Sequence, residues 1–288
     1  MTMNESFRPL KGKPVVEALS AEIRARAQSL ASAHRKPKLA IVRLGERPDD
    51  LAYERSIAKR CEALDVETQV EALAADAPQR ELTALLERLR DDDGVDGILP
   101  FRPLPAQIDM QAVKRALAPE KDVDCIGPGG SAAVFDRSLG GYLPCTAEAV
   151  MEMLRFYEVP LAGARAVVLG RSLVVGRALA LLLMDAHCTV TVCHSRTRNL
   201  PDVAAQGDIL VCAMGRARMV GAEYVKPGAV VIDVGINDDG GGICGDADFD
   251  AIATVASAAT PVPGGIGAVT TTLLVRNVVQ ACTQRFAR

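Results

Sequence analysis

The stretch AVVLGRSLVVGRALALLL, residues 166–183, decides the fold of this chain. Its first five residues form an apolar run of strand length that ends at Gly170, and a helical pattern begins near Gly176. Where a strand turns through glycine into a helix, exposed backbone N–H groups and the helix dipole favour a bound anion such as pyrophosphate. The pattern is not GxGxxG, so an ordinary tight strand–helix turn is the alternative.

The segment after the next strand bears on the identity of the nucleotide. TVTVC, residues 189–193, runs into HSRT, which contains Ser195 and Arg196. NAD-binding folds commonly place an acid about 20 residues after the glycine turn, where it binds a ribose hydroxyl. This segment has no acid, and its hydroxyl and guanidinium groups, with Arg171 in the first turn, suit an extra phosphate. The pattern predicts NADP rather than NAD, with a solvated basic loop as the alternative.

Strands and helices alternate along the rest of the chain, which predicts an α/β fold with mainly parallel sheets. Expected helices cover residues 14–33, 50–64, 80–90, 177–186 and 269–286. Expected strands cover residues 39–44, 66–73, 94–100, 166–170, 189–193, 208–214 and 229–235.

The length of 288 residues suits two domains. A stretch rich in Gly, Pro and Ser, residues 127–146, is the expected boundary. We expect a first domain of residues 1–146, joined by the C-terminal helix at about 269–288, and a second, Rossmann-like domain of residues 147–268. Two α/β domains of this kind would leave a cleft where a ligand can bind.

Composition and charge narrow the class of protein. Apolar residues make up 49% of the chain, charged residues 24%, and the net charge is −3, which argues against nucleic acid or a membrane surface as a partner. No apolar run is long enough to span a bilayer, and the N-terminus has no signal-peptide core. Eight cysteines without a CxxC motif indicate reduced, mostly buried thiols of a cytoplasmic protein. The three histidines show no metal-ligand spacing, so we expect no metal site.

Three further features could bind a ligand. TPVPGGIG, residues 260–267, has two prolines and three glycines, so it could wrap a planar ligand, or it could be a structural connection. Tyr53 lies on an expected helix, and Asp124 lies just before the glycine-rich boundary. A tyrosine is often a packing residue, and an aspartate before a loop is often a cap or turn former.

Together these segments resemble the bifunctional methylenetetrahydrofolate dehydrogenase/cyclohydrolase family. The likeness covers nearly the whole chain and runs through VDGILPFRPLP, PEKDVDC, GRSLVVGRALALLL, VTVCHSRT, DILVCAMGRARMV, KPGAVVIDVGIN and TPVPGGIGAVTTTLL. The resemblance implies that NADP lies on the second domain and a reduced folate lies in the cleft. It also implies a cytoplasmic homodimer.

The resemblance carries roles to the residues that match the family's motifs. Tyr53 would pack on the folate and Asp124 would hold the pterin ring, so both are candidate catalytic and substrate-binding residues. The implied cofactor-binding residues are Gly170, Arg171, Ser172, Gly176, Ser195, Arg196 and Ile236. The implied folate-side loop consists of Pro263, Gly264, Gly265, Ile266 and Gly267.

The chain departs from the family pattern at the one-carbon end of the implied site. Ile57 occupies the position of a lysine one helical turn after the tyrosine, and Phe101 occupies that of a glutamine. Asp50, Cys125 and Ala268 replace a serine, a glycine and a proline. Isoleucine and phenylalanine neither donate nor accept a proton, which cyclohydrolysis requires.

Dehydrogenation is a hydride transfer that depends mainly on positioning, so it can survive these changes. The sequence therefore predicts an NADP-dependent methylenetetrahydrofolate dehydrogenase in which cyclohydrolase activity is absent or weak. Two alternatives remain: a relative that acts on a different one-carbon or iminium substrate, and a non-catalytic subunit that binds NADP or folate.

Overall fold

The computed structural model describes residues 6–286, and the chain divides into two compact units. The six-stranded unit comprises Met1–Glu17 and Pro144–Thr270, and the three-stranded unit comprises Ala18–Leu143 and Thr271–Arg288. Helices α1 (Gly12–Ala33) and α10 (Ile266–Phe286) each contribute residues to both units. Each unit is described by itself below.

The six-stranded unit is built on a parallel sheet with the order β1-β11-β8-β7-β5-β6 in the described residues. The chain passes from β5 to its neighbour β6 and then crosses to β7 on the other side of β5. The reversal makes the carboxyl ends of these three strands a topological switch point, where open α/β sheets bind ligands. The strands are β1 (Arg8–Pro9), β5 (Arg165–Leu169), β6 (Thr189–Cys193), β7 (Ile209–Cys212), β8 (Val230–Asp233) and β11 (Ala258–Ala259).

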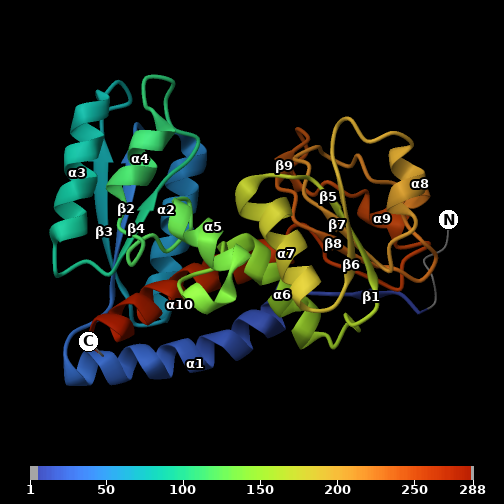
Figure 1. Ribbon diagram of the computed structural model, residues 1–288, viewed down its shortest axis with the longest axis horizontal. Coiled ribbons are helices and arrows are strands. Elements are labelled where there is room, and N and C mark those ends of the chain that lie inside the picture. The colour runs from blue at the N-terminus through green and yellow to red at the C-terminus, as the bar shows by residue number, and fades with distance from the viewer. Residues whose placement is uncertain (1–5, 287–288) are drawn as a thin grey trace. The chain divides into compact units, whose positions relative to one another are not determined.

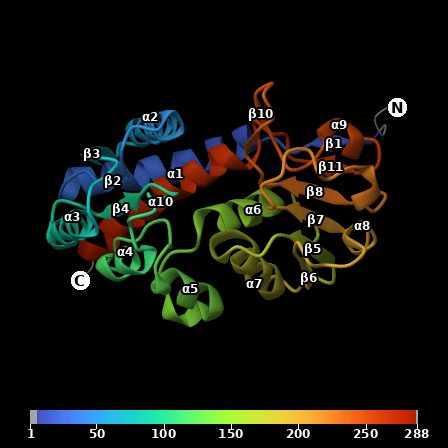
Figure 2. The same ribbon diagram turned by 90° about the horizontal axis from the view of Figure 1, so that it is seen from above.

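Helices cover both faces of this sheet, as near-continuous apolar strands require. Helices α6 (Cys145–Phe156) and α7 (Ala178–Asp185) lie on one side, and α8 (Leu200–Ala204) and α9 (Phe249–Ile252) lie on the other (Figures 1 and 2). Alternate residues of β5 and β7, such as Val167 and Leu210, join a core cluster with residues of α8 and α9. Short turns of helix at η2 (Leu173–Arg177) and η3 (Ala222–Tyr224) and a ribbon of β9 (Asn237–Asp238) with β10 (Ile243–Cys244) complete the unit.

The three-stranded unit has β2 (Lys38–Leu44) between β3 (Glu67–Leu73) and β4 (Gly97–Pro100), all parallel. Ala40, Val42 and Ile98 share a core cluster with leucines of α3 (Gln79–Asp91) and with Val113 of α4 (Met110–Ala116). The other helices of this unit are α2 (Pro48–Ala63), α5 (Pro128–Phe135) and the short η1 (Arg137–Leu139).

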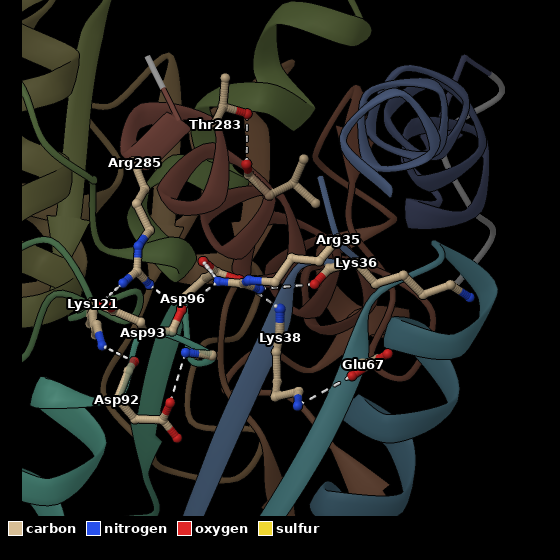
Figure 3. Close-up of polar contacts among 12 residues, drawn as sticks. Arg35, Lys36, Lys38, Glu67, Asp92, Asp93, Asp96, Lys121, Thr283 and Arg285 are labelled. Atoms are coloured by element: carbon tan, nitrogen blue, oxygen red, sulfur yellow. Dashed lines mark hydrogen bonds and ion pairs between the residues drawn. The ribbon is translucent and has the colours of Figure 1, made fainter. Parts of the chain in front are cut away.

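A buried carboxylate ties together the amino ends of β2 and β4. Asp96, which is 3% exposed, accepts hydrogen bonds from two guanidinium nitrogens of Arg35 at 2.8 Å and from the backbone N–H of Lys38 at 2.9 Å (Figure 3). Nearby, Lys121 donates to the backbone carbonyls of Leu89 and Asp92. These bonds are structural, and they lie at the end of the strands opposite to Phe101, which follows β4.

The expected elements are confirmed, and several further elements were not predicted. These are helices α4, α5, α6, α8 and α9 and strands β1, β9, β10 and β11. Helix α5 lies inside the glycine-rich stretch that was expected to be a boundary. The first residues, assigned above to the first domain, belong to the six-stranded unit because β1 pairs with β11 and the Gly12 N–H donates to the Gly264 carbonyl at 2.8 Å. All eight cysteines are buried. Among the described residues, none of the helices is both long and apolar enough to cross a membrane.

Candidate functional site

The glycine turn after β5 has the close packing that a nucleotide site requires. Gly170 has φ +131°, and a Cβ on it would collide with the carbonyl oxygen of Ala213, which follows β7. A Cβ on Gly176 would collide with the carbonyl of Gly170 itself. Only glycine fits at these two positions, while Arg171 and Ser172 between them are exposed. The turn therefore leaves backbone and two polar side chains open to a ligand at the switch point.

The loop after β6 presents its polar side chains to solvent at the same edge of the sheet. The His194 N–H donates to the Thr197 hydroxyl at 2.9 Å, and the Arg196 N–H donates to His194 Nδ1 at 3.1 Å. These local bonds fix the turn, so the exposed side chains of Ser195 and Arg196 are carried on a defined backbone. No carboxylate within residues 6–286 forms an ion pair with Arg171 or Arg196. Both guanidinium groups are thus available to an anion.

Two buried aspartates, which the sequence analysis did not select, hold the loops after β7 and β8. Asp246 is fully buried and accepts hydrogen bonds from the backbone N–H groups of Met214, Gly215 and Arg216 and from the Asn237 amide. Asp233 accepts from three backbone N–H groups, including that of Asp246 at 3.0 Å. Burial raises the pKa of Asp233 to about 6, against the lowering effect of these donors. Asp246 lies in the segment GDADF, residues 245–249. The role of Asp246 depends on contacts with backbone N–H groups, which no residue pattern reveals.

The proline–glycine loop closes the same unit. The hydroxyl of the buried Thr260 accepts a hydrogen bond from the Asp233 N–H at 2.7 Å, which attaches the loop to β8. Pro263, Gly264 and Gly267 are exposed. Gly265 and Ile266 are buried, so these two could reach a ligand only through their backbone. Ile236 is 69% exposed, and its Cδ1 lies 3.9 Å from the position that a Cβ of Gly267 would take. The structure therefore brings Ile236 and this loop together.

In the three-stranded unit, Tyr53 of α2 lies against Phe101. The centroids of the two rings are 5.3 Å apart, within the range of favourable aromatic pairs. Tyr53 is 41% exposed and Phe101 is 5% exposed, so one aromatic face is open and the other is packed. Ile57, one turn after Tyr53, is completely buried. The position at which the resemblance implies a lysine is therefore part of the apolar core.

Asp50, which the sequence places near Tyr53, has both carboxylate oxygens engaged. Arg47 donates to Oδ2 at 2.8 Å and to Oδ1 at 2.7 Å, a bidentate pair. The Asp50 side chain is only 10% exposed. A carboxylate held in this way is a poor candidate for proton transfer to a bound ligand.

Asp124 forms an ion pair that the sequence analysis missed. Arg102 Nη2 donates to Asp124 Oδ2 at 2.7 Å. Burial raises the pKa of Asp124 to about 6, and the positive charge of Arg102 opposes that rise. Arg102 lies in the segment GILPFRPLP, residues 97–105, so a single charge in an otherwise apolar segment was the available signal.

The residue after Asp124 has a backbone conformation that explains the family's glycine. Cys125 has φ +56°, in the left-handed region that glycine adopts most easily. A Cβ on Gly130 would collide with the Cβ of Cys125, so this residue packs directly against helix α5. Cys125 is 2% exposed and therefore contributes packing rather than a contact with a ligand.

Comparison with known proteins gives a consistent result. The family model described as tetrahydrofolate dehydrogenase/cyclohydrolase, catalytic domain, matches residues 10–124. The model described as the NAD(P)-binding domain of the same family matches residues 144–286. "Bifunctional protein FolD 1" of Desulfitobacterium hafniense is 49% identical over 274 residues, which cover 95% of this chain and 98% of that protein. "Bifunctional protein FolD" of Clostridioides difficile is also 49% identical, covering 97% and 98%.

Solved structures agree with this match. The bifunctional FolD methylenetetrahydrofolate dehydrogenase/cyclohydrolase of Campylobacter jejuni has a TM-score of 0.93 and 36% identity, covering 97% of this chain and 99% of that one. The FolD protein of Trypanosoma brucei, complexed with NADP cofactor and inhibitor, has a TM-score of 0.92 and 34% identity, with complete coverage of both chains.

Proposed function

Because the chain belongs to the tetrahydrofolate dehydrogenase/cyclohydrolase family, we propose that it is an NADP-dependent methylenetetrahydrofolate dehydrogenase with absent or weak cyclohydrolase activity. The six-stranded unit would bind NADP, and the three-stranded unit would supply Tyr53 and Asp124 to the reduced folate. Relatives named bifunctional have two activities by name, and the proposal assigns one of them to this chain.

The observation that carries the proposal is the burial of Ile57. A lysine at this position would be the ammonium group nearest to Tyr53, and the chain places a fully buried aliphatic side chain there instead. Phe101 replaces an amide with an aromatic ring, and Asp50 is held by Arg47. Hydrolysis of the methenyl group needs a proton donor or acceptor at the carbon, and none of these three side chains serves that need.

The residues of the glycine turn fit NADP. Gly170 and Gly176 let the backbone of the turn pack closely where any side chain would collide with a carbonyl group, and a helix begins at once after them. Arg171, Ser195 and Arg196 would hold the additional phosphate, since exposed guanidinium groups match phosphate oxygens. The Trypanosoma brucei relative is named as a complex with NADP, which supports the same choice for this chain.

NADP, when bound, would supply a hydride acceptor for the methylene carbon of the folate. The residues of the chain would orient the folate and exclude water from it, and none of them would have to move a proton. Tyr53 would offer its exposed face to the pterin, with Phe101 packed behind it. Asp124 would accept hydrogen bonds from the pterin edge. Ile236 and the loop from Pro263 to Gly267 would line the site in the six-stranded unit.

A paired assay on one preparation tests the proposal. NADP reduction with methylenetetrahydrofolate and hydrolysis of methenyltetrahydrofolate should be measured side by side, and we expect the first without the second. Binding of both ligands without turnover would favour a non-catalytic subunit. Tight NADP binding without activity on folate would favour a different one-carbon or iminium substrate.

The family resemblance also leads us to propose a homodimer in the cytoplasm. One chain has a mass of 30.5 kDa, and light scattering at working concentration should give twice that mass. A monomeric mass across the accessible concentration range would contradict the dimer.

A further inference from the structure

The Asp124 carboxylate is held on a rigid backbone. Asp122, two residues earlier, is 3% exposed and accepts hydrogen bonds from the N–H groups of Ile126 at 3.1 Å and Gly127 at 2.7 Å. The Cys125 N–H donates to the Asp122 carbonyl at 3.1 Å. The segment that carries Asp124 is therefore fixed on both sides, and its carboxylate has little freedom to move toward a ligand.

Arg102 reaches this carboxylate from another fixed segment. The Phe101 N–H donates to the Val42 carbonyl at 2.8 Å, so the backbone just before Arg102 is attached to β2. Arg102 contacts only one carboxylate oxygen of Asp124, Oδ2. Within residues 6–286, Oδ1 accepts no hydrogen bond, and 23% of the Asp124 side chain is exposed. The pair thus leaves one oxygen available to donors from solvent or a ligand.

We propose that Arg102 is a positioning residue that holds Oδ2 of Asp124 and leaves Oδ1 for the N–H donors of a bound reduced folate. The inference rests on the role proposed above for Asp124. It assigns a function to Arg102, a side chain that the sequence analysis did not select.

The protonation state of Asp124 near neutral pH depends on the charges around it. Burial and the negative charge of Asp122 both raise the pKa of Asp124, and Arg102 is the cation that opposes them. Without Arg102, the carboxyl group would be protonated over a larger part of the neutral range. A protonated carboxyl group accepts fewer hydrogen bonds than a carboxylate, and its own O–H would face the N–H donors of the folate. Arg102 would therefore extend folate binding toward lower pH.

The test compares Arg102→Leu, which removes the charge and the hydrogen-bond donors, with Arg102→Lys, which keeps the charge. Arg115→Leu is the control for net charge, since Arg115 pairs loosely with Asp109 at 3.7 Å on the surface of the same unit. In ligand-free protein, the 13C signal of the Asp124 carboxyl, assigned by its loss in Asp124→Asn, should titrate about 1–3 pH units higher in Arg102→Leu. Arg102→Lys and Arg115→Leu should titrate near the unmodified protein.

Calorimetry with tetrahydrofolate across the pH range gives the second readout. We expect the affinity of Arg102→Leu at pH 7 to fall by about 2- to 100-fold, as a rise of about 1–3 pH units from a pKa of about 6 implies. The pH below which affinity falls should rise by the same interval as the titration. An unshifted titration with an unchanged profile would overturn the proposal, as would tighter binding in Arg102→Leu, which would make Arg102 a competitor of the ligand. If the titration shifts but the unmodified protein binds no reduced folate, the proposed substrate fails and the positioning of the carboxylate stands.

Discussion

The ring of Tyr53 lies 5.3 Å from the ring of Phe101, centroid to centroid, with the two planes inclined at 36°. The pair forms an aromatic wall in which Tyr53 is open and Phe101 is closed to solvent. Phe101 adds an aromatic ring with no proton donor or acceptor to this wall. The hydroxyl of Tyr53 is the one polar group that the pair offers.

The first prediction concerns hydrolysis of methenyltetrahydrofolate. The unmodified protein should accelerate decay little above background, and Ile57→Lys/Phe101→Gln should accelerate it, because general acid–base help is commonly worth about 100- to 10,000-fold. Since Ile57 is fully buried, circular dichroism must first establish a temperature at which each variant is folded. Ile57→Met, similar in volume and without an amine, is the matched control. Rapid decay with the unmodified protein would show that another group performs the hydrolysis.

The second prediction concerns the nucleotide. Calorimetry should show at least a tenfold preference for NADP over NAD, since charge-assisted contacts are worth roughly 1.5–3 kcal/mol each. Arg196→Ala should reduce NADP affinity about tenfold and leave NAD affinity nearly unchanged. Arg165→Ala removes an equal charge at the opposite end of β5 and should alter neither. Equal affinities for the two nucleotides in the unmodified protein would refute the assignment.

The third prediction concerns Asp124 and pH. The folded-state pKa of this carboxyl, about 6, is above the usual unfolded value near 3.9, so ionisation costs folded-state stability as pH rises between these values. Above about pH 6 the loss of stability caused by ionisation of Asp124 is complete, and below about pH 4 there is no such loss. Asp124→Asn should therefore be more stable than the unmodified protein by about 1–3 kcal/mol at pH 7.5, with no difference near pH 4.

The same variant should lose reduced-folate affinity while NADP affinity stays near that of the unmodified protein. Urea unfolding at several pH values and calorimetry with each ligand measure the two effects. If both affinities fall together, Asp124 is a structural residue. If its stability difference is independent of pH, the carboxyl does not titrate in the stated range.

The fourth prediction concerns Asp246. Asp246→Ala would remove the buried acceptor of three backbone N–H groups, so we expect a loss of about 1–3 kcal/mol in urea unfolding and weaker NADP binding. Asp248→Asn is the control, because Asp248 caps α9 through one N–H, and asparagine caps a helix nearly as well. If a folded Asp246→Ala protein keeps its NADP affinity, the loops after β7 and β8 do not contribute to the cofactor site.

Much of the fold followed from local patterns, and the exceptions have physical causes. The strands near Val167 and Leu210 are apolar runs between turn residues, so their positions were predictable. The two-residue strand β1 is too short for any periodicity, and only its partner β11 defines it. At the site, glycines and substitutions were visible in the sequence. The ion pair of Arg102 with Asp124 was not, because its members are 22 residues apart on two irregular segments.

The order in which the two units are encoded constrains how the protein can be made. On a ribosome, Arg8 emerges early, yet its strand partner Ala258 is translated near the end. The three-stranded unit likewise waits for Thr271 and the residues after it. Neither unit can be completed before nearly the whole chain has left the exit tunnel, so its nascent forms expose unpaired strand edges for a long time. Truncation near the C-terminus should therefore damage both units, and holdase chaperones should matter more for this chain than for one whose domains are encoded consecutively.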